Sequence, residues 1–74
     1  METIGERAAQ AVIARSKENG TSLTAELKRI DCTLSTAKGW NYHGRNPSAY
    51  FLQQMALAGY DVYYILTGEV KHGQ

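Results

Sequence analysis

The chain has 74 residues, of which 43% are hydrophobic and 20% are charged, and its formal net charge is +1. This length allows one domain with one compact core, and the composition excludes a disordered or fibrous chain. The sequence has no apolar run near the ~18 residues of a membrane span, no signal-peptide pattern, and one cysteine, which excludes an internal disulfide and a cysteine-cluster metal site. We therefore expect a cytoplasmic protein without membrane contact, metal or cofactor.

Capping and stop residues predict two helices in the first part of the chain. Thr3 and Glu6 form a capping-box pattern, so the first helix begins after Thr3 and ends at Asn19-Gly20. Ser22 can cap a second, short helix that ends near Asp31. The apolar residues that recur at helical spacing in these segments are Ile4, Ala8, Ala11, Val12, Leu23, Leu27 and Ile30.

Three more helices follow. Thr33 or Ser35 can cap a third helix that runs through Trp40 to Tyr42, where the loop 43–47 interrupts it. Asn46 as cap and Pro47 in the first turn predict a fourth helix that ends at Gly59. Asp61 can cap a fifth that ends at Gly68. The residues expected to point inward from the last two helices are Phe51, Leu52, Met55, Ala56, Val62, Ile65 and Leu66.

No stretch alternates at period two for long enough to predict a strand. We therefore expect an all-α domain of five helices over residues 1–70, followed by a flexible tail over residues 71–74.

The charges are distributed unevenly along the chain. Residues 1–31 carry five acidic and five basic residues, whereas residues 32–60 carry Lys38, Arg45 and no acid. A surface that approaches phosphates avoids carboxylates, because each would repel the polyanion. Chance alone also accounts for such a window in so short a chain, so this pattern leaves both explanations open.

The stretch from Gly20 to Glu69 resembles the lambda-repressor-like helix-turn-helix domain of Cro and phage repressors. Ser22 stands where that family caps its second helix, and YYILTGE resembles the WLLTGE ending of many phage repressors. Apolar residues also stand at the positions that flank the turn and point inward from the recognition helix: Ile30, Cys32, Ala37 and Trp40. Three residues depart from the pattern, namely Asp31 where glycine is usual in the turn, Leu27 where a small residue is usual, and Glu26 where leucine is common.

This resemblance implies a sequence-specific regulator of transcription that binds double-stranded DNA, a phage or prophage Cro-like repressor that binds a palindromic operator as a homodimer. It implies that the third helix lies in the major groove. The residues placed at base-reading positions are Leu34, Ser35, Lys38 and Gly39, and those placed near phosphates are Ser22, Thr33, Tyr42, His43 and Arg45. Because the sequence ends after the fifth helix, we expect no C-terminal oligomerisation domain.

Each of these residues also has a simpler interpretation. Thr33 and Ser35 can serve as helix caps alone, and Lys38 can be an ordinary surface lysine. Cys32 and His43 can be written as a nucleophile and base, but no orienting third residue accompanies them, so we expect no enzyme and no small-molecule substrate. The alternative functions are an antitoxin-type autoregulator and a helical protein-interaction module that has lost DNA binding.

Three tyrosines crowd the predicted fifth helix, at Tyr60, Tyr63 and Tyr64. Because Val62, Ile65 and Leu66 already supply its inward face, we expect at least one tyrosine to be exposed. An exposed aromatic residue there favours an interface, so Tyr63 and Tyr64 are the candidate anchors of a symmetric dimer.

Overall fold

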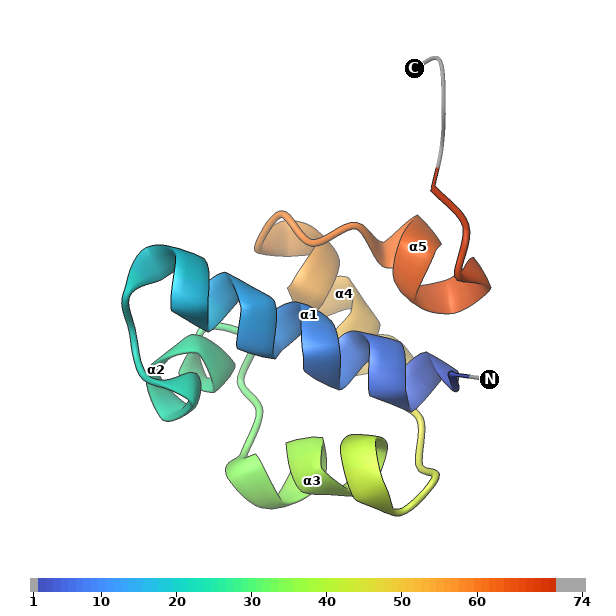
Figure 1. The fold of residues 1–74 in the computed structure, drawn as a ribbon, viewed down its shortest axis with the longest axis horizontal. Helices are drawn as coiled ribbons and strands as arrows, with labels where there is room; N and C mark the ends of the chain where they lie inside the picture. The colour runs from blue at the N-terminus through green and yellow to red at the C-terminus, as the bar shows by residue number, and fades with distance from the viewer. Residues whose placement is uncertain (1, 71–74) are drawn as a thin grey trace.

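The computed structural model describes residues 2–70, which form five α-helices and no strand (Figure 1). The helices are α1 (Ile4–Asn19), α2 (Leu23–Lys28), α3 (Leu34–Tyr42), α4 (Ala49–Leu57) and α5 (Val62–Thr67). The expectation of an all-α chain is confirmed for these residues, and the tail predicted at 71–74 lies outside them. None of the helices in the described range is long and apolar enough to span a bilayer.

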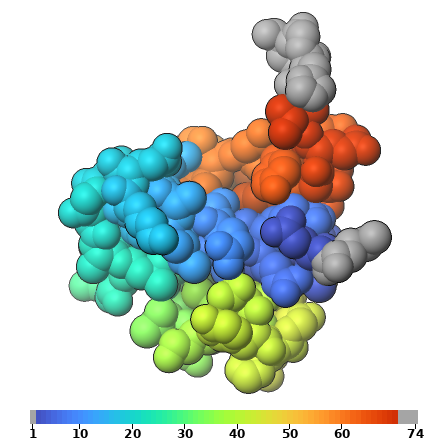
Figure 2. Space-filling model, in the orientation of Figure 1, coloured from blue at the N-terminus to red at the C-terminus, as the bar shows by residue number. Residues whose placement is uncertain are grey.

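The long helix α1 is the central element of the fold. Its predicted capping box is present, since the Thr3 hydroxyl accepts the Glu6 backbone N–H and the Glu6 carboxylate accepts that of Thr3. Gly20 ends the helix in the left-handed conformation, as expected. Helices α3 and α5 lie on opposite sides of α1 (Figure 1), and in the space-filling view they form opposite edges of the molecule (Figure 2).

One hydrophobic core joins all five helices. Val12, Leu27, Trp40, Met55 and Ile65, one from each helix, are all buried in it. The Trp40 and Phe51 rings meet edge to face, with 5.6 Å between their centroids, which ties α3 to α4. The core therefore fixes α3 on the body of the domain through its apolar face.

The predicted start of α4 is wrong. The helix begins at Ala49 with Ser48 as the N-cap, whereas Asn46 accepts the backbone N–H of Gly5 through its side-chain oxygen, 3.2 Å away. Asn46 thus helps to satisfy the first turn of α1 instead of α4, and Pro47 is buried before the helix starts. Ala56 was expected to point inward but is exposed.

Helix α5 begins and ends where the sequence predicts. Asp61 accepts the Tyr64 N–H at 3.0 Å, and Gly68 ends the helix with φ 77°. The expectation that Leu66 points inward is wrong, because its side chain is 43% exposed, whereas Ile65 is buried and Val62 is half-buried. With only six residues, the helix buries a single narrow stripe centred on Ile65.

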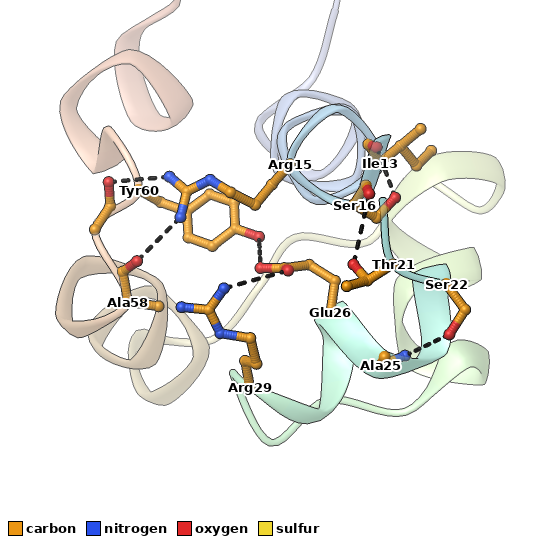
Figure 3. Close-up of polar contacts among 11 residues, drawn as sticks. Ile13, Arg15, Ser16, Thr21, Ser22, Ala25, Glu26, Arg29, Ala58 and Tyr60 are labelled. Atoms are coloured by element: carbon orange, nitrogen blue, oxygen red, sulfur yellow. Dashed lines mark hydrogen bonds and ion pairs between the residues drawn. The ribbon is translucent and has the colours of Figure 1, made fainter. Parts of the chain in front are cut away.

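Two arginines of α1 bind the ends of the last two helices. The Arg15 guanidinium donates to the carbonyl oxygens of Ala58 and Gly59, both at 3.1 Å, and lies 4.2 Å from the centre of the Tyr60 ring (Figure 3). Arg7 donates to the carbonyl oxygens of Ile65 and Leu66. A cation is stabilising at a helix C-terminus, where the last carbonyls lack partners within the helix. These contacts hold α4 and α5 against α1.

Glu26 anchors α2 by a buried hydrogen bond. Its side chain is inaccessible to solvent and accepts the Tyr60 hydroxyl at 2.7 Å, while Arg29 lies 3.4 Å away (Figure 3). A buried carboxylate requires such partners, because the desolvation of an unpaired charge is costly. The departure noted at Glu26 is thus accommodated by Tyr60, which lies 34 residues later in the chain.

Candidate nucleic-acid interface

Residues 29–33 form the tight turn between α2 and α3. Asp31 occupies the left-handed region with φ 58°, a conformation that aspartate adopts more readily than most non-glycine residues. The backbone N–H groups of Asp31 and Cys32 donate to the carbonyls of Lys28 and Leu27, at 3.1 and 3.0 Å. Ile30 and Cys32 are buried on either side of Asp31, as expected. The turn is closed by these bonds and anchored in the core, so it sets the direction of α3.

The N-terminus of α3 is capped by Thr33 and not by Ser35. The Thr33 hydroxyl accepts the Thr36 backbone N–H at 3.2 Å and lies 3.0 Å from the Thr36 hydroxyl. Ala37 and Trp40 point into the core, as predicted. The cap and the buried side chains fix which face of α3 meets solvent.

The solvent-facing side of α3 carries no acidic residue. It consists of Leu34, Ser35, Lys38 and Tyr42, which are all exposed, with Leu34 at 40% and Tyr42 at 71%. Leu34, Lys38 and Tyr42 are spaced four residues apart and therefore form one stripe along the helix. We call these four residues, together with Thr33, the α3 face.

Gly39 does not belong to this face. It is buried, and a Cβ atom at this position would lie 3.2 Å from Cδ of Arg45, whose side chain covers it. The sequence-based assignment of Gly39 to a base-reading position therefore disagrees with the geometry. Here the stem of the Arg45 side chain lies over the glycine, which leaves Gly39 no exposed surface that can approach a base.

The residues expected near phosphates are all exposed, but they lie on three different segments. Thr33 and Tyr42 are at the two ends of α3, and His43 and Arg45 follow in the loop. Ser22 is at the start of α2, where its hydroxyl accepts the Ala25 N–H at 3.1 Å (Figure 3). The structure thus groups four of the five around α3, and Ser22 is a helix cap on the preceding element.

Lys28 is a candidate that the sequence reasoning missed. It is exposed in the last turn of α2 and lines a surface groove together with Asp31, Thr33 and Leu34. The sequence indicates this candidate only by placing Lys28 directly before the turn that leads into the predicted recognition helix. Its amino group adds a positive charge beside the N-terminus of α3.

Asp31 supplies the one carboxylate of that groove, and a hydrogen bond from a neutral hydroxyl stabilises it. The Tyr50 hydroxyl of α4 donates to the Asp31 carboxylate at 2.7 Å. This bond is the main reason that the pKa of Tyr50 is raised above its ordinary value. The bond also links the turn to α4, so two elements hold Asp31 in place.

Cys32 does not have the properties of an activated nucleophile. Burial, and to a smaller extent the Asp31 carboxylate, raise the pKa of its thiol from 9.0 to about 11. The thiol donates to the Thr33 carbonyl at 3.4 Å and remains protonated at neutral pH. Within residues 2–70, no three His, Cys, Asp or Glu side chains are grouped in a way that holds a metal ion.

The tyrosines near α5 differ in exposure. Tyr60 is buried, Tyr64 is half-buried, and Tyr63 is 41% exposed. The prediction that at least one is exposed is confirmed. Leu66 and Val70 are also exposed, at 43% and 58%, and follow Tyr63 at spacings of three and seven residues.

Compared with known proteins, the chain matches no family model, no curated protein and no solved structure. The function of this chain is therefore inferred from the geometry of its own residues.

Proposed function

We propose that the chain is a sequence-specific regulator with a lambda-repressor-like helix-turn-helix fold, in which α3 lies in the major groove of double-stranded DNA. The observation that carries this proposal is the α3 face, an exposed helical surface without carboxylates that follows a closed turn. The face itself carries the base Lys38, and Lys28 and Arg45 stand in the segments on either side of α3. This combination is what a polyanion requires of a contacting helix.

The size of the side chains also supports groove binding. The major groove is about 12 Å wide and accepts an α-helix whose leading side chains are short. Thr33 and Ser35 are small, and neither position carries a charge. In the proposed complex Leu34, Ser35 and Lys38 contact base edges, and Lys38 is the strong reader because a lysine donates to guanine O6 and N7. The phosphate contacts come from Ser22, Thr33, Tyr42, His43, Arg45 and, in addition, Lys28.

In the proposed complex two copies bind a palindromic operator, with half-sites about 34 Å apart along the DNA. A single domain of this size reads too few base pairs for high affinity, which is why a dimer is needed. By occupying a promoter in this way, the protein acts as a Cro-like repressor in the cytoplasm. An antitoxin-type autoregulator uses the same interface, and its distinguishing feature is a protein partner.

The experiment compares Lys38→Ala with Arg45→Ala on DNA sites selected from a random pool. Lys38→Ala should cost about 1–3 kcal/mol on the best site and relax the preference at one base position, because it removes a base contact. Arg45→Ala should weaken binding to all sequences alike and make the slope of log K against log salt shallower by about one, because it removes a phosphate contact.

Lys17→Ala is the matched control, since Lys17 is an exposed lysine of α1 outside the proposed interface. It should leave both the affinity and the preferred sequence unchanged. If Lys38→Ala binds every sequence as the parent does, α3 is not the recognition helix. Binding of a protein partner that resists added salt, with no DNA binding, would instead favour the interaction module.

A further inference from the structure

A pocket opens beside the α3 face, and Leu34, Lys38 and Tyr42 of that face are among its lining residues. Its cavity volume is about 100 Å³, and it lies where α1, α2 and α3 meet. Its apolar walls are Val12 and Ile13 of α1, Leu23 and Leu27 of α2, and Leu34 and Ala37 of α3. Neither the core packing nor the proposed base contacts require an open apolar space at this junction.

The polar groups of the pocket all come from α3, and Lys38 is the one that carries a charge. Lys38, Asn41 and Tyr42 line it at relative positions i, i+3 and i+4, so they share one face of the helix. No lining residue is acidic. Within residues 2–70 the ion pair is that of Arg29 with Glu26, so Lys38 has no carboxylate partner there.

We propose that this pocket binds a small aliphatic monocarboxylate, with the hydrocarbon chain between α1 and α2 and the carboxylate at Lys38. The charge complementarity favours an anion, and the apolar walls favour a hydrocarbon chain. The volume is about two thirds of the roughly 150 Å³ apolar cavity that holds a benzene molecule, so the pocket encloses part of a short hydrocarbon chain, and the rest of a six-carbon chain lies along its open mouth. A drug-sized molecule is too large, because such ligands occupy roughly 300–1,000 Å³.

The test uses hexanoate, hexan-1-ol and hexylammonium, which share one chain length and differ in charge. Each is titrated into the ¹⁵N-labelled chain at pH 7, without DNA. Hexanoate should produce saturable shifts at the amides of Val12, Ile13, Leu23 and Ala37, with hexanol weaker and hexylammonium weakest. If hexanoate gives no saturable shift at these amides, or if the three compounds bind equally, the proposal is wrong.

Lys38→Met tests the role of the charge, because methionine keeps an apolar stem of similar length. It should weaken hexanoate binding about three- to fivefold, the size of an exposed ion pair, and leave hexanol binding unchanged. Lys17→Met is the control and should change neither. Ile13→Trp should fill the pocket and abolish the binding of both compounds, with circular dichroism to confirm that the helices remain. Equal effects of Lys38→Met on hexanoate and hexanol would contradict the assigned position of the carboxylate.

If the chain binds DNA as proposed, a ligand in this pocket should also affect DNA binding, and this consequence rests on the proposed function. Leu34, Lys38 and Tyr42 belong both to the pocket and to the proposed DNA surface, so bound hexanoate should weaken DNA binding in a fluorescence-anisotropy assay. The shift titration contains no DNA, and a chain that fails to bind DNA therefore leaves the ligand result intact. If hexanoate binds while the DNA affinity stays the same, the prediction that hexanoate and DNA compete for the same residues is wrong.

Discussion

Glu26 shows how a single residue can depart from a sequence pattern for a structural reason. A leucine at this position would add to the core, whereas this chain buries a carboxylate and supplies the Tyr60 hydroxyl and Arg29 as partners. Burial and the bond to Glu26 both raise the pKa of Tyr60 above its ordinary value, because both disfavour the charged phenolate. The pair is therefore satisfied only while both members are present.

Tyr60→Phe should lower the free energy of unfolding by about 1–3 kcal/mol, because it leaves a buried carboxylate oxygen without its donor. Tyr50→Phe is a matched control, since it removes the same hydroxyl from a bond of the same 2.7 Å length to an exposed carboxylate. Its cost should be smaller, because water replaces the lost donor. Urea unfolding measures both, and equal losses would contradict the role assigned to burial.

Because of Cys32, the free energy of unfolding should decrease at alkaline pH. Its thiol pKa is about 11 in the folded chain, against an ordinary value of 9.0. The unfolded chain loses this proton first, so the free energy of unfolding falls as the pH rises from 9 towards 11. Between pH 8 and pH 10 the thiol should account for a loss of about 1 kcal/mol. Urea unfolding of Cys32→Ala should show a correspondingly shallower decline, and identical slopes would contradict the shift.

At the scale of elements, local capping chemistry explains why most helix boundaries could be predicted. Thr3, Ser22, Thr33 and Asp61 all accept a backbone N–H at the start of the helix that the sequence assigns to them. These signals act within three residues, so the sequence alone contains them. Asn46 carried the same signal but bonds to Gly5, 41 residues away, and only the folded chain shows that contact.

The residues of the candidate site also differ in whether local sequence signals or contacts in the folded chain determine their positions. Leu34, Ser35 and Lys38 could be assigned to an exposed face because helical spacing and a buried Trp40 determine it. Gly39 could not be placed correctly, because its burial depends on the conformation of the loop that carries Arg45. The position of Lys28 shortly before the predicted recognition helix is visible in the sequence, but the groove that it lines with Thr33 and Leu34 follows from the turn geometry, which residue spacing does not describe.

Gly5 and Gly39 offer a direct comparison of two helical glycines. A Cβ atom at Gly5 would collide with the carbonyl oxygen of Arg45 and lie 2.8 Å from that of Trp40, whereas at Gly39 it would meet only the flexible Arg45 side chain. Gly5→Ala should therefore lower the free energy of unfolding by about 1–3 kcal/mol through overpacking. Gly39→Ala should be neutral or raise it by up to about 1 kcal/mol, since alanine is the better helix former.

Thermal or urea unfolding of the two variants decides between these outcomes. Equal destabilisation by both would indicate that Gly39 also requires close backbone approach. Stabilisation by Gly5→Ala would contradict the observed contact of α1 with the segment after α3.

At the scale of the whole molecule, the net charge understates the positive charge near α3. Of the seven Lys and Arg in residues 2–70, Arg7 and Arg15 bind main-chain carbonyls and Arg29 is paired with Glu26. The remaining four are Lys17, Lys28, Lys38 and Arg45, and all but Lys17 lie in α3 or in the segments next to it. The arginines of α1 hold the helices together, whereas Lys28, Lys38 and Arg45 concentrate positive charge around α3, as the proposed DNA binding requires.

The position of α5 opposite α3 allows a dimer contact that leaves the proposed DNA surface open. Tyr63, Leu66 and Val70 are the exposed apolar residues there, whereas the half-buried Tyr64 is a weaker candidate than the sequence suggested. We expect a weak symmetric homodimer, and Tyr63→Ser and Leu66→Ser should each weaken association by about 1–2 kcal/mol. Sedimentation equilibrium over a concentration series measures this effect.

Tyr42→Ser is the control for this experiment, because Tyr42 is a more exposed tyrosine and belongs to α3, which lies on the other side of α1 from α5. Since association through α5 does not involve α3, this variant should dimerise as the parent does. The same series run with bound DNA adds a stricter condition, because two half-sites raise the local concentration of the second copy. A chain that remains monomeric even there, or a Tyr42→Ser effect equal to that of Tyr63→Ser, would exclude α5 as the dimer contact.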